Sequence, residues 1–165
     1  NITSFFTRHI VDADVKNKLS GLVPPITIFF PFDFVYIINT EVNISIISIN
    51  SKLPVIGYGG TQRVVWDLAY ALHRLGHNVT LLAAKGTRCS FASVIEYDPA
   101  TPFEAQIPTS IDIVHAHSGC PDIDTPTVRT IHGNSDSIAR ANNIYVSKNH
   151  AERHGGSCYV YNGLN

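Results

Sequence analysis

The sequence predicts an α/β fold, a Rossmann-like and mainly parallel sheet with helices on both faces. Residues 43–49 form a β-branched, apolar run that is typical of a parallel strand buried on both faces. A glycine-containing loop at 52–60, an amphipathic helical pattern at 61–75 and a second apolar run at 79–84 follow, as in a strand–helix–strand crossover. The same alternation continues more faintly to the end of the chain, which indicates one sheet covered on both faces.

The helix predicted for residues 61–75 has clear limits. Thr61 is the expected N-cap, and Gly76 is the expected residue at which the helix stops. The apolar residues between them fall on one stripe: Val64, Val65, Leu68, Ala71, Leu72 and Leu75.

The later elements are shorter. Strands are expected at residues 93–97, 111–115, 128–131, 143–146 and 157–161. A short helix is expected at residues 147–154. Its polar side chains, Lys148, Asn149, His150, Glu152, Arg153 and His154, predict a face turned to solvent.

The first part of the chain lacks this rhythm. We therefore predict an N-terminal segment of uncertain role at residues 1–42, followed by a Rossmann-like domain at residues 43–165. The most apolar stretch, residues 22–38, is short for a membrane span and is interrupted by three prolines and Asp33. Buried strand or extended structure is the favoured interpretation, and membrane contact is the alternative.

Charge and cysteine content exclude some classes of function. Lys and Arg number 12 against 13 Asp and Glu, a net charge of −1, and no basic stripe is visible, so a nucleic-acid partner has no electrostatic support. Cys89, Cys120 and Cys158 form no CxxC pair, and their odd number favours free thiols in a reducing cytosol. No secretory signal is evident in the first residues.

The glycine-rich loop before the predicted helix is the first candidate site. Gly57, Gly59, Gly60 and Thr61 lie where small residues let the backbone approach a ligand, and free N–H groups at the helix start favour an anion such as phosphate. The loop matches neither the GxGxxG fingerprint nor a Walker loop. A glycine-rich turn without a ligand is the alternative.

Three histidines end predicted strands. Ligands of open α/β sheets gather at the carboxyl ends of the strands, where His115, His117 and His132 lie. We expect His115 and His117 on opposite faces, which argues against a two-histidine metal site and gives at least one of them a structural role. His132, followed at once by Gly133, could hydrogen-bond a sugar hydroxyl or orient a reacting group, and a capped strand end is the alternative.

Taken in order, these residues resemble glycosyltransferase family 4, whose members are retaining enzymes of GT-B fold. The resemblance covers about residues 43–165. The matching stretches are residues 58–82, 112–117, 130–133, 145–148 and 160–165.

The resemblance implies roles for individual residues. Gly59 and Gly60 match a glycine pair near the donor diphosphate and the acceptor, with Thr61 beside them. His132 matches a histidine that contacts the donor sugar, and Gly133 lets the chain turn away. His115 and His117 match a pair in the cleft wall, with less certain roles.

The resemblance also implies a reaction. A sugar would pass from a nucleotide-sugar donor to a glycan or small polar acceptor, without a metal ion or another cofactor. Most of the donor would be held by a C-terminal GT-B domain that this chain lacks, so the chain would be inactive alone. The expected location is the cytoplasm, with peripheral attachment to the inner face of the membrane left open. A non-catalytic Rossmann-like binding module and a sugar-nucleotide epimerase of GT-B fold are the alternatives.

Overall fold

The computed structural model describes residues 41–134 and 141–162. The chain divides into two units, Asn1–Thr40 and Glu41–Asn165, and all described residues belong to the second unit. Apart from residues 41 and 42, the segment predicted at 1–42, with its apolar stretch at 22–38, lies outside the described residues. Among the described helices, none has the length and apolar character needed to cross a membrane.

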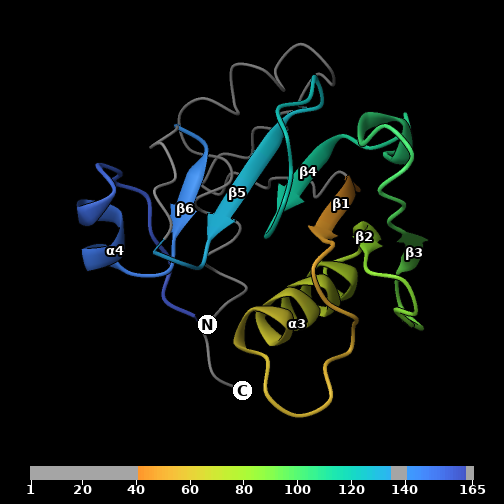
Figure 1. Ribbon diagram of the computed structural model, residues 1–165, viewed down its shortest axis with the longest axis horizontal. Helices are drawn as coiled ribbons and strands as arrows, with labels where there is room; N and C mark the ends of the chain where they lie inside the picture. The colour runs from red at the N-terminus through yellow and green to blue at the C-terminus, as the bar shows by residue number, and fades with distance from the viewer. Residues whose placement is uncertain (1–40, 135–140, 163–165) are drawn as a thin grey trace, which may run out of the picture. The chain divides into compact units, whose positions relative to one another are not determined.

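Within the described residues, six strands form one parallel sheet in the order β3-β2-β1-β4-β5-β6 (Figure 1). The strands are β1 (Asn43–Ser48), β2 (Asn78–Ala83), β3 (Ser93–Glu96), β4 (Ile113–Ala116), β5 (Thr127–Ile131) and β6 (Asn143–Tyr145). This order reverses direction between β1 and β4, which makes that pair the topological switch point of a doubly wound sheet. The predicted α/β fold with a Rossmann-like parallel sheet is confirmed.

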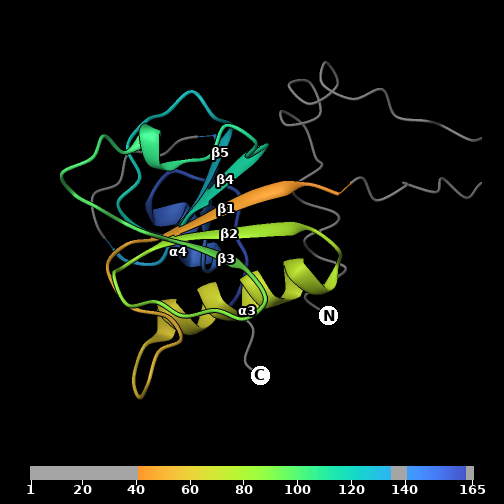
Figure 2. The same ribbon diagram turned by 90° about the vertical axis from the view of Figure 1, so that its right-hand side faces the viewer.

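Helix α3 (Gly60–Arg74) runs along one face of the sheet (Figure 2). The predicted apolar stripe is the reason, because its members Val65, Leu68 and Leu72 are buried. Gly76 ends the helix as expected and takes a φ of 89°, a left-handed value that suits glycine. The prediction of Thr61 as N-cap is wrong, because Gly59 holds that position and no side chain caps the helix.

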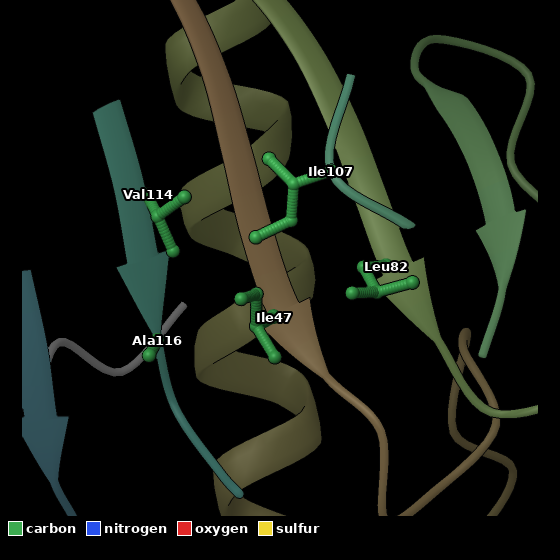
Figure 3. Packing of buried hydrophobic residues seen from close by; sticks show 5 residues of the cluster. All are labelled: Ile47, Leu82, Ile107, Val114 and Ala116. Atoms are coloured by element: carbon green, nitrogen blue, oxygen red, sulfur yellow. The ribbon is translucent and has the colours of Figure 1, made fainter. Parts of the chain in front are cut away.

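The opposite face of the sheet is covered largely by the connection between β3 and β4, which includes the 3-10 helix η1 (Glu104–Gln106). Ile107 from this connection packs onto side chains of three neighbouring strands. Figure 3 shows this cluster on the side of the sheet away from α3: Ile47, Leu82, Ile107, Val114 and Ala116, all buried. Burial of this layer fixes the strand register at the centre of the sheet.

Two predicted strands differ from the structure by more than one residue at an end. β4 spans Ile113–Ala116 rather than 111–115, because Ile111 instead packs against the apolar cluster. The strand expected at 157–161 is reduced to a single bridge between Tyr145 and Tyr159. The short helix α4 (Lys148–Arg153) follows β6 and is capped by the Ser147 side chain, which accepts a hydrogen bond from the His150 N–H.

Candidate functional site

A cleft of about 400 Å³ opens at the carboxyl ends of β1, β4 and β5, next to the start of α3. This is the switch point of the sheet, where the connections from β1 and β4 leave toward opposite sides and leave space for a ligand. The lining residues are Ser48, Asn50, Ser51, Thr61, Gln62, Ala116, His117, Ser118, Gly119, Cys120, Arg129, Thr130, Ile131, His132 and Gly133.

The structure brings four of the seven predicted site residues into this lining: Thr61, His117, His132 and Gly133. Gly59 and Gly60 directly precede Thr61 at the start of α3 and do not themselves line the cleft. His115 lies against the ring of His117 without reaching the cleft. We call residues 57–62 the glycine rim, and His115, His117 and His132 the histidine rim.

The glycine rim owes its shape to a close approach at Gly59. Gly59 is buried, and a Cβ atom there would lie 2.6 Å from Val55 Cγ2 and 2.9 Å from Gln62 Oε1. Gln62 in turn donates a hydrogen bond of 2.8 Å to Ser51 Oγ, which ties the helix start to the chain after β1. Gly60 is exposed and has open space around the position of a Cβ atom. A side chain is therefore excluded at Gly59, while the backbone at Gly60 is open to a ligand.

The histidine rim is a stack of three imidazoles. The ring centroids of His115 and His117 lie 4.4 Å apart, and those of His117 and His132 lie 5.1 Å apart. The expectation that His115 and His117 face opposite ways is therefore wrong. Residues two apart in a strand share a face, and the backbone of His117 still bonds to Ile47, as a strand residue would.

Hydrogen bonds fix these rings in place. His117 Nδ1 lies 2.9 Å from His132 Nε2, and His115 Nε2 lies 2.7 Å from Thr130 Oγ1. An imidazole–imidazole hydrogen bond needs one ring to donate and the other to accept, so the accepting ring is neutral. His117 Nε2 is buried and has no hydrogen bond to the described residues.

Burial keeps the histidine rim uncharged. Burial, together with a smaller contribution from the nearby His132, lowers the pKa of His115 to about 4. Burial also lowers the pKa of His117, with contributions from His115 and His132, and it lowers the pKa of His132 with a contribution from His150. All three imidazoles are therefore mainly neutral at pH 7. The two that line the cleft, His117 and His132, can exchange hydrogen bonds with a ligand but cannot neutralise a phosphate.

Among the described residues that line the cleft, Arg129 carries the one permanent positive charge, and that charge is already paired. Its guanidinium lies 3.1 Å from an Asp122 carboxylate oxygen and donates a hydrogen bond of 2.9 Å to the Pro121 carbonyl. Cys120 is a free thiol, and burial raises its pKa, so it stays protonated and is a poor nucleophile at neutral pH. The cleft is thus close to electrically neutral.

Sequence reasoning missed several lining residues. Ser48 ends the buried strand β1, and Asn50 and Ser51 follow it; polar residues in that position are a signal that could have identified them. Arg129 gave no such signal, because it lies inside β5, and it lines the cleft beside Ala116, its partner on β4. Among the described residues, no three His, Cys, Asp or Glu side chains are grouped so as to hold a metal ion.

Comparison with known proteins shows what this fold resembles. No family model and no curated protein sequence matches the chain. One similar solved structure is the crystal structure of AviGT4, a glycosyltransferase involved in avilamycin A biosynthesis. The TM-score is 0.55 at 22% sequence identity, over 76% of this chain and 43% of AviGT4. The chain therefore shares the fold of slightly less than half of a glycosyltransferase.

Proposed function

We propose that this chain is the acceptor-side domain of a glycosyltransferase that moves a sugar from a nucleotide-sugar donor to a sugar or small polar acceptor. The observation that carries the proposal is the composition of one cleft. Thr61 from the glycine rim, His117 and His132 from the histidine rim, and Gly133 meet at the switch point of the sheet. Ligands of open parallel sheets bind at this position.

The chemistry of the lining suits an uncharged, hydroxylated ligand. Hydroxyl and amide side chains dominate it, contributed by Ser48, Asn50, Ser51, Thr61, Gln62, Ser118 and Thr130. Such groups both donate and accept hydrogen bonds, as sugar hydroxyls do. The paired state of Arg129 leaves little unbalanced charge to attract an acidic ligand. These features favour a glycan or small polyol as the molecule held against this domain.

His132 is the residue best placed to contact the reacting sugar. Its ring is half-buried, lines the cleft and is held from behind by His117. Because it is mainly neutral at pH 7, it would bind a sugar hydroxyl through one hydrogen bond. Gly59, Gly60 and Thr61 would bring backbone N–H groups at the start of α3 toward the donor.

The leaving diphosphate needs charge stabilisation that this cleft does not supply by itself. Sugar transfer builds negative charge on the diphosphate, and enzymes offset it with fixed positive groups. The N-terminus of α3 offers only a partial positive charge, and the guanidinium of Arg129 is already paired. We therefore include a C-terminal GT-B domain that holds most of the nucleotide. Retention at the anomeric carbon, with no metal ion and no cofactor, belongs to the same proposal.

The test uses the longest natural polypeptide that carries this sequence. It is mixed with a panel of UDP-, GDP- and ADP-hexoses, and release of nucleoside diphosphate is measured with and without simple sugar acceptors. We expect at least one donor to be consumed, and His132→Ala to lower turnover about tenfold through loss of one hydrogen bond to the reacting sugar. His73→Ala removes an exposed imidazole from α3 and serves as the matched control with normal turnover.

Two results would contradict the proposal. If no nucleotide-sugar of the panel is bound or consumed, the cleft does not serve glycosyl transfer, and the binding-module alternative gains support. If a donor is consumed but His132→Ala turns over like the wild type while both proteins fold equally well, His132 is not part of the site.

A further inference from the structure

Helix α4 holds the segment that follows β5. His150 is 3% exposed, and its Nε2 lies 2.9 Å from the Gly133 carbonyl oxygen. Arg153, on the same helix, donates a hydrogen bond of 2.9 Å to Asn134 Oδ1. The two residues directly after His132 are therefore each held by a side chain of α4. The prediction that the polar side chains of this helix form a solvated face is wrong at His150, which is buried.

The carbonyl of Gly133 can only accept a hydrogen bond, so His150 must donate its Nε2–H. That requirement fixes His150 as a neutral Nε2–H tautomer or as a cation. Its Nδ1 is buried without a hydrogen bond to the described residues, and a proton on this atom would have no acceptor there. The neutral Nε2–H tautomer therefore satisfies the site best.

The ring of His150 is locked by its surroundings. The His150 N–H bonds to the Ser147 side chain at 3.1 Å, which sets the first turn of α4. Tyr145 meets the His150 ring edge-on, with centroids 5.2 Å apart. Tyr145 is itself fully buried and packs against Gly156, where an added Cβ atom would lie 2.3 Å from the Tyr145 ring. His150 is consequently a rigid donor rather than a mobile surface side chain.

Gly133 has no comparable restraint of its own. It is exposed and has no side chain, and nothing lies within 4 Å of the position a Cβ atom would take. Among the described residues, the direction in which the chain leaves His132 is therefore set by the hydrogen bond from His150 to Gly133 and by that from Arg153 to Asn134.

We propose that His150 is a positioning residue for His132, acting through the Gly133 carbonyl. His150 does not line the cleft and so would not touch a ligand there. The His132 ring is then held twice, by His117 through its side chain and by His150 through its backbone. The inference rests on the proposed role of His132 as the sugar-contacting residue.

Three variants separate the hydrogen bond from packing. His150→Phe keeps a flat ring against Tyr145 but removes the donor, and His150→Gln places an amide N–H near the position of Nε2. His154→Phe is the matched control, because His154 also stacks on Tyr145 and makes no side-chain hydrogen bond to residues 132–134 within the described part of the chain. Turnover, KM and unfolding midpoints are measured in the longest natural polypeptide, and the His132 ring is followed by nitrogen-15 NMR.

We expect His150→Phe to lower kcat about tenfold or more, since small displacements of positioned groups carry large rate losses. His150→Gln should recover most of this loss, and His154→Phe should behave as wild type. The ring signals of His132 should move in His150→Phe and stay close to wild type in the other two variants. In the wild type, His150 should show the Nε2–H tautomer.

The inference is overturned if His150→Phe leaves both kcat and the His132 ring signals unchanged, or if His150→Gln is as impaired as His150→Phe although both fold. If His150→Phe does not fold, the tautomer of wild-type His150 still decides, and a proton on Nδ1 alone excludes the bond to Gly133. If no variant, wild type included, consumes a nucleotide-sugar, the proposed function fails, while the NMR comparison still reports on His150.

Discussion

The two rims of the cleft are built by opposite means. The glycine rim depends on the absence of side chains, since Gly59 fits against Val55 and Gly60 leaves its backbone open. The histidine rim depends on side chains that fill their space completely, with His115 and His117 buried and bonded to their neighbours. The proposed site thus combines an open backbone at the start of α3 with hydrogen-bonded imidazole rings at the ends of β4 and β5.

The comparison also shows where each rim is vulnerable. The histidine rim is stable only while its imidazoles are uncharged, because three close rings in a buried stack cannot share added positive charge at low cost. The glycine rim contains no group that titrates near neutral pH, and it is instead destabilised by added side-chain atoms at Gly59. Acid should therefore damage one rim, and an added methyl group the other.

The largest effect expected is the acid sensitivity of the histidine rim. The pKa of His115 falls from 6.5 to about 4 on folding. Between these values the unfolded chain binds a proton that the folded protein does not, so the free energy of unfolding decreases as the pH is lowered through this window. At about 1.4 kcal/mol per pH unit, His115 alone accounts for about 3 kcal/mol. His117 and His132 act in the same direction.

Urea denaturation at several pH values measures this effect. His115→Gln keeps a side-chain amide near Thr130 but cannot be protonated, so its curve between pH 6.5 and 4 should be shallower than that of the wild type. Identical slopes in the two proteins would show that His115 is not kept neutral by the fold.

A smaller effect is expected at the glycine rim. Gly59→Ala should lower the free energy of unfolding by about 1–3 kcal/mol, because the new methyl group displaces Val55 and Gln62. Gly60→Ala is the matched control for stability and should stay within about 0.5 kcal/mol of the wild type. Both are measured by urea denaturation at neutral pH. Equal losses in the two variants would contradict the steric account of Gly59.

Much of the fold could be predicted because its signals are local. Two apolar runs, one helical apolar stripe and Gly76 predict the strand–helix–strand unit from β1 to β2. The observed bounds of these elements agree with the predicted ones within a residue or two. The missed N-cap at Thr61 has a tertiary cause, because Gly59 is buried against Val55 before the helix starts. The strand predicted at residues 157–161 pairs with β6 only through the bridge between Tyr145 and Tyr159, and no local pattern in the sequence shows how far such a pairing extends.

The candidate site was predictable only in part. Strand ends pointed to His115, His117 and His132, but their mutual hydrogen bonds depend on the pairing of β4 with β5, which no local pattern encodes. The same holds for His150, since its bond to Gly133 joins residues 17 positions apart. The place of Arg129 in the cleft likewise depends on the pairing of β5 with β4, and its ion pair with Asp122 joins residues seven positions apart.

One titration tests the central claim that both rims contact the same ligand. Isotope-labelled protein, as the longest natural polypeptide, is titrated with the nucleotide-sugar panel and followed by NMR. We predict that a binding donor shifts the His132 ring and the Thr61 amide together, with the same midpoint. The account is contradicted if a donor binds and shifts neither, or shifts instead the region around Trp66 and Phe91, which pack together outside the cleft lining.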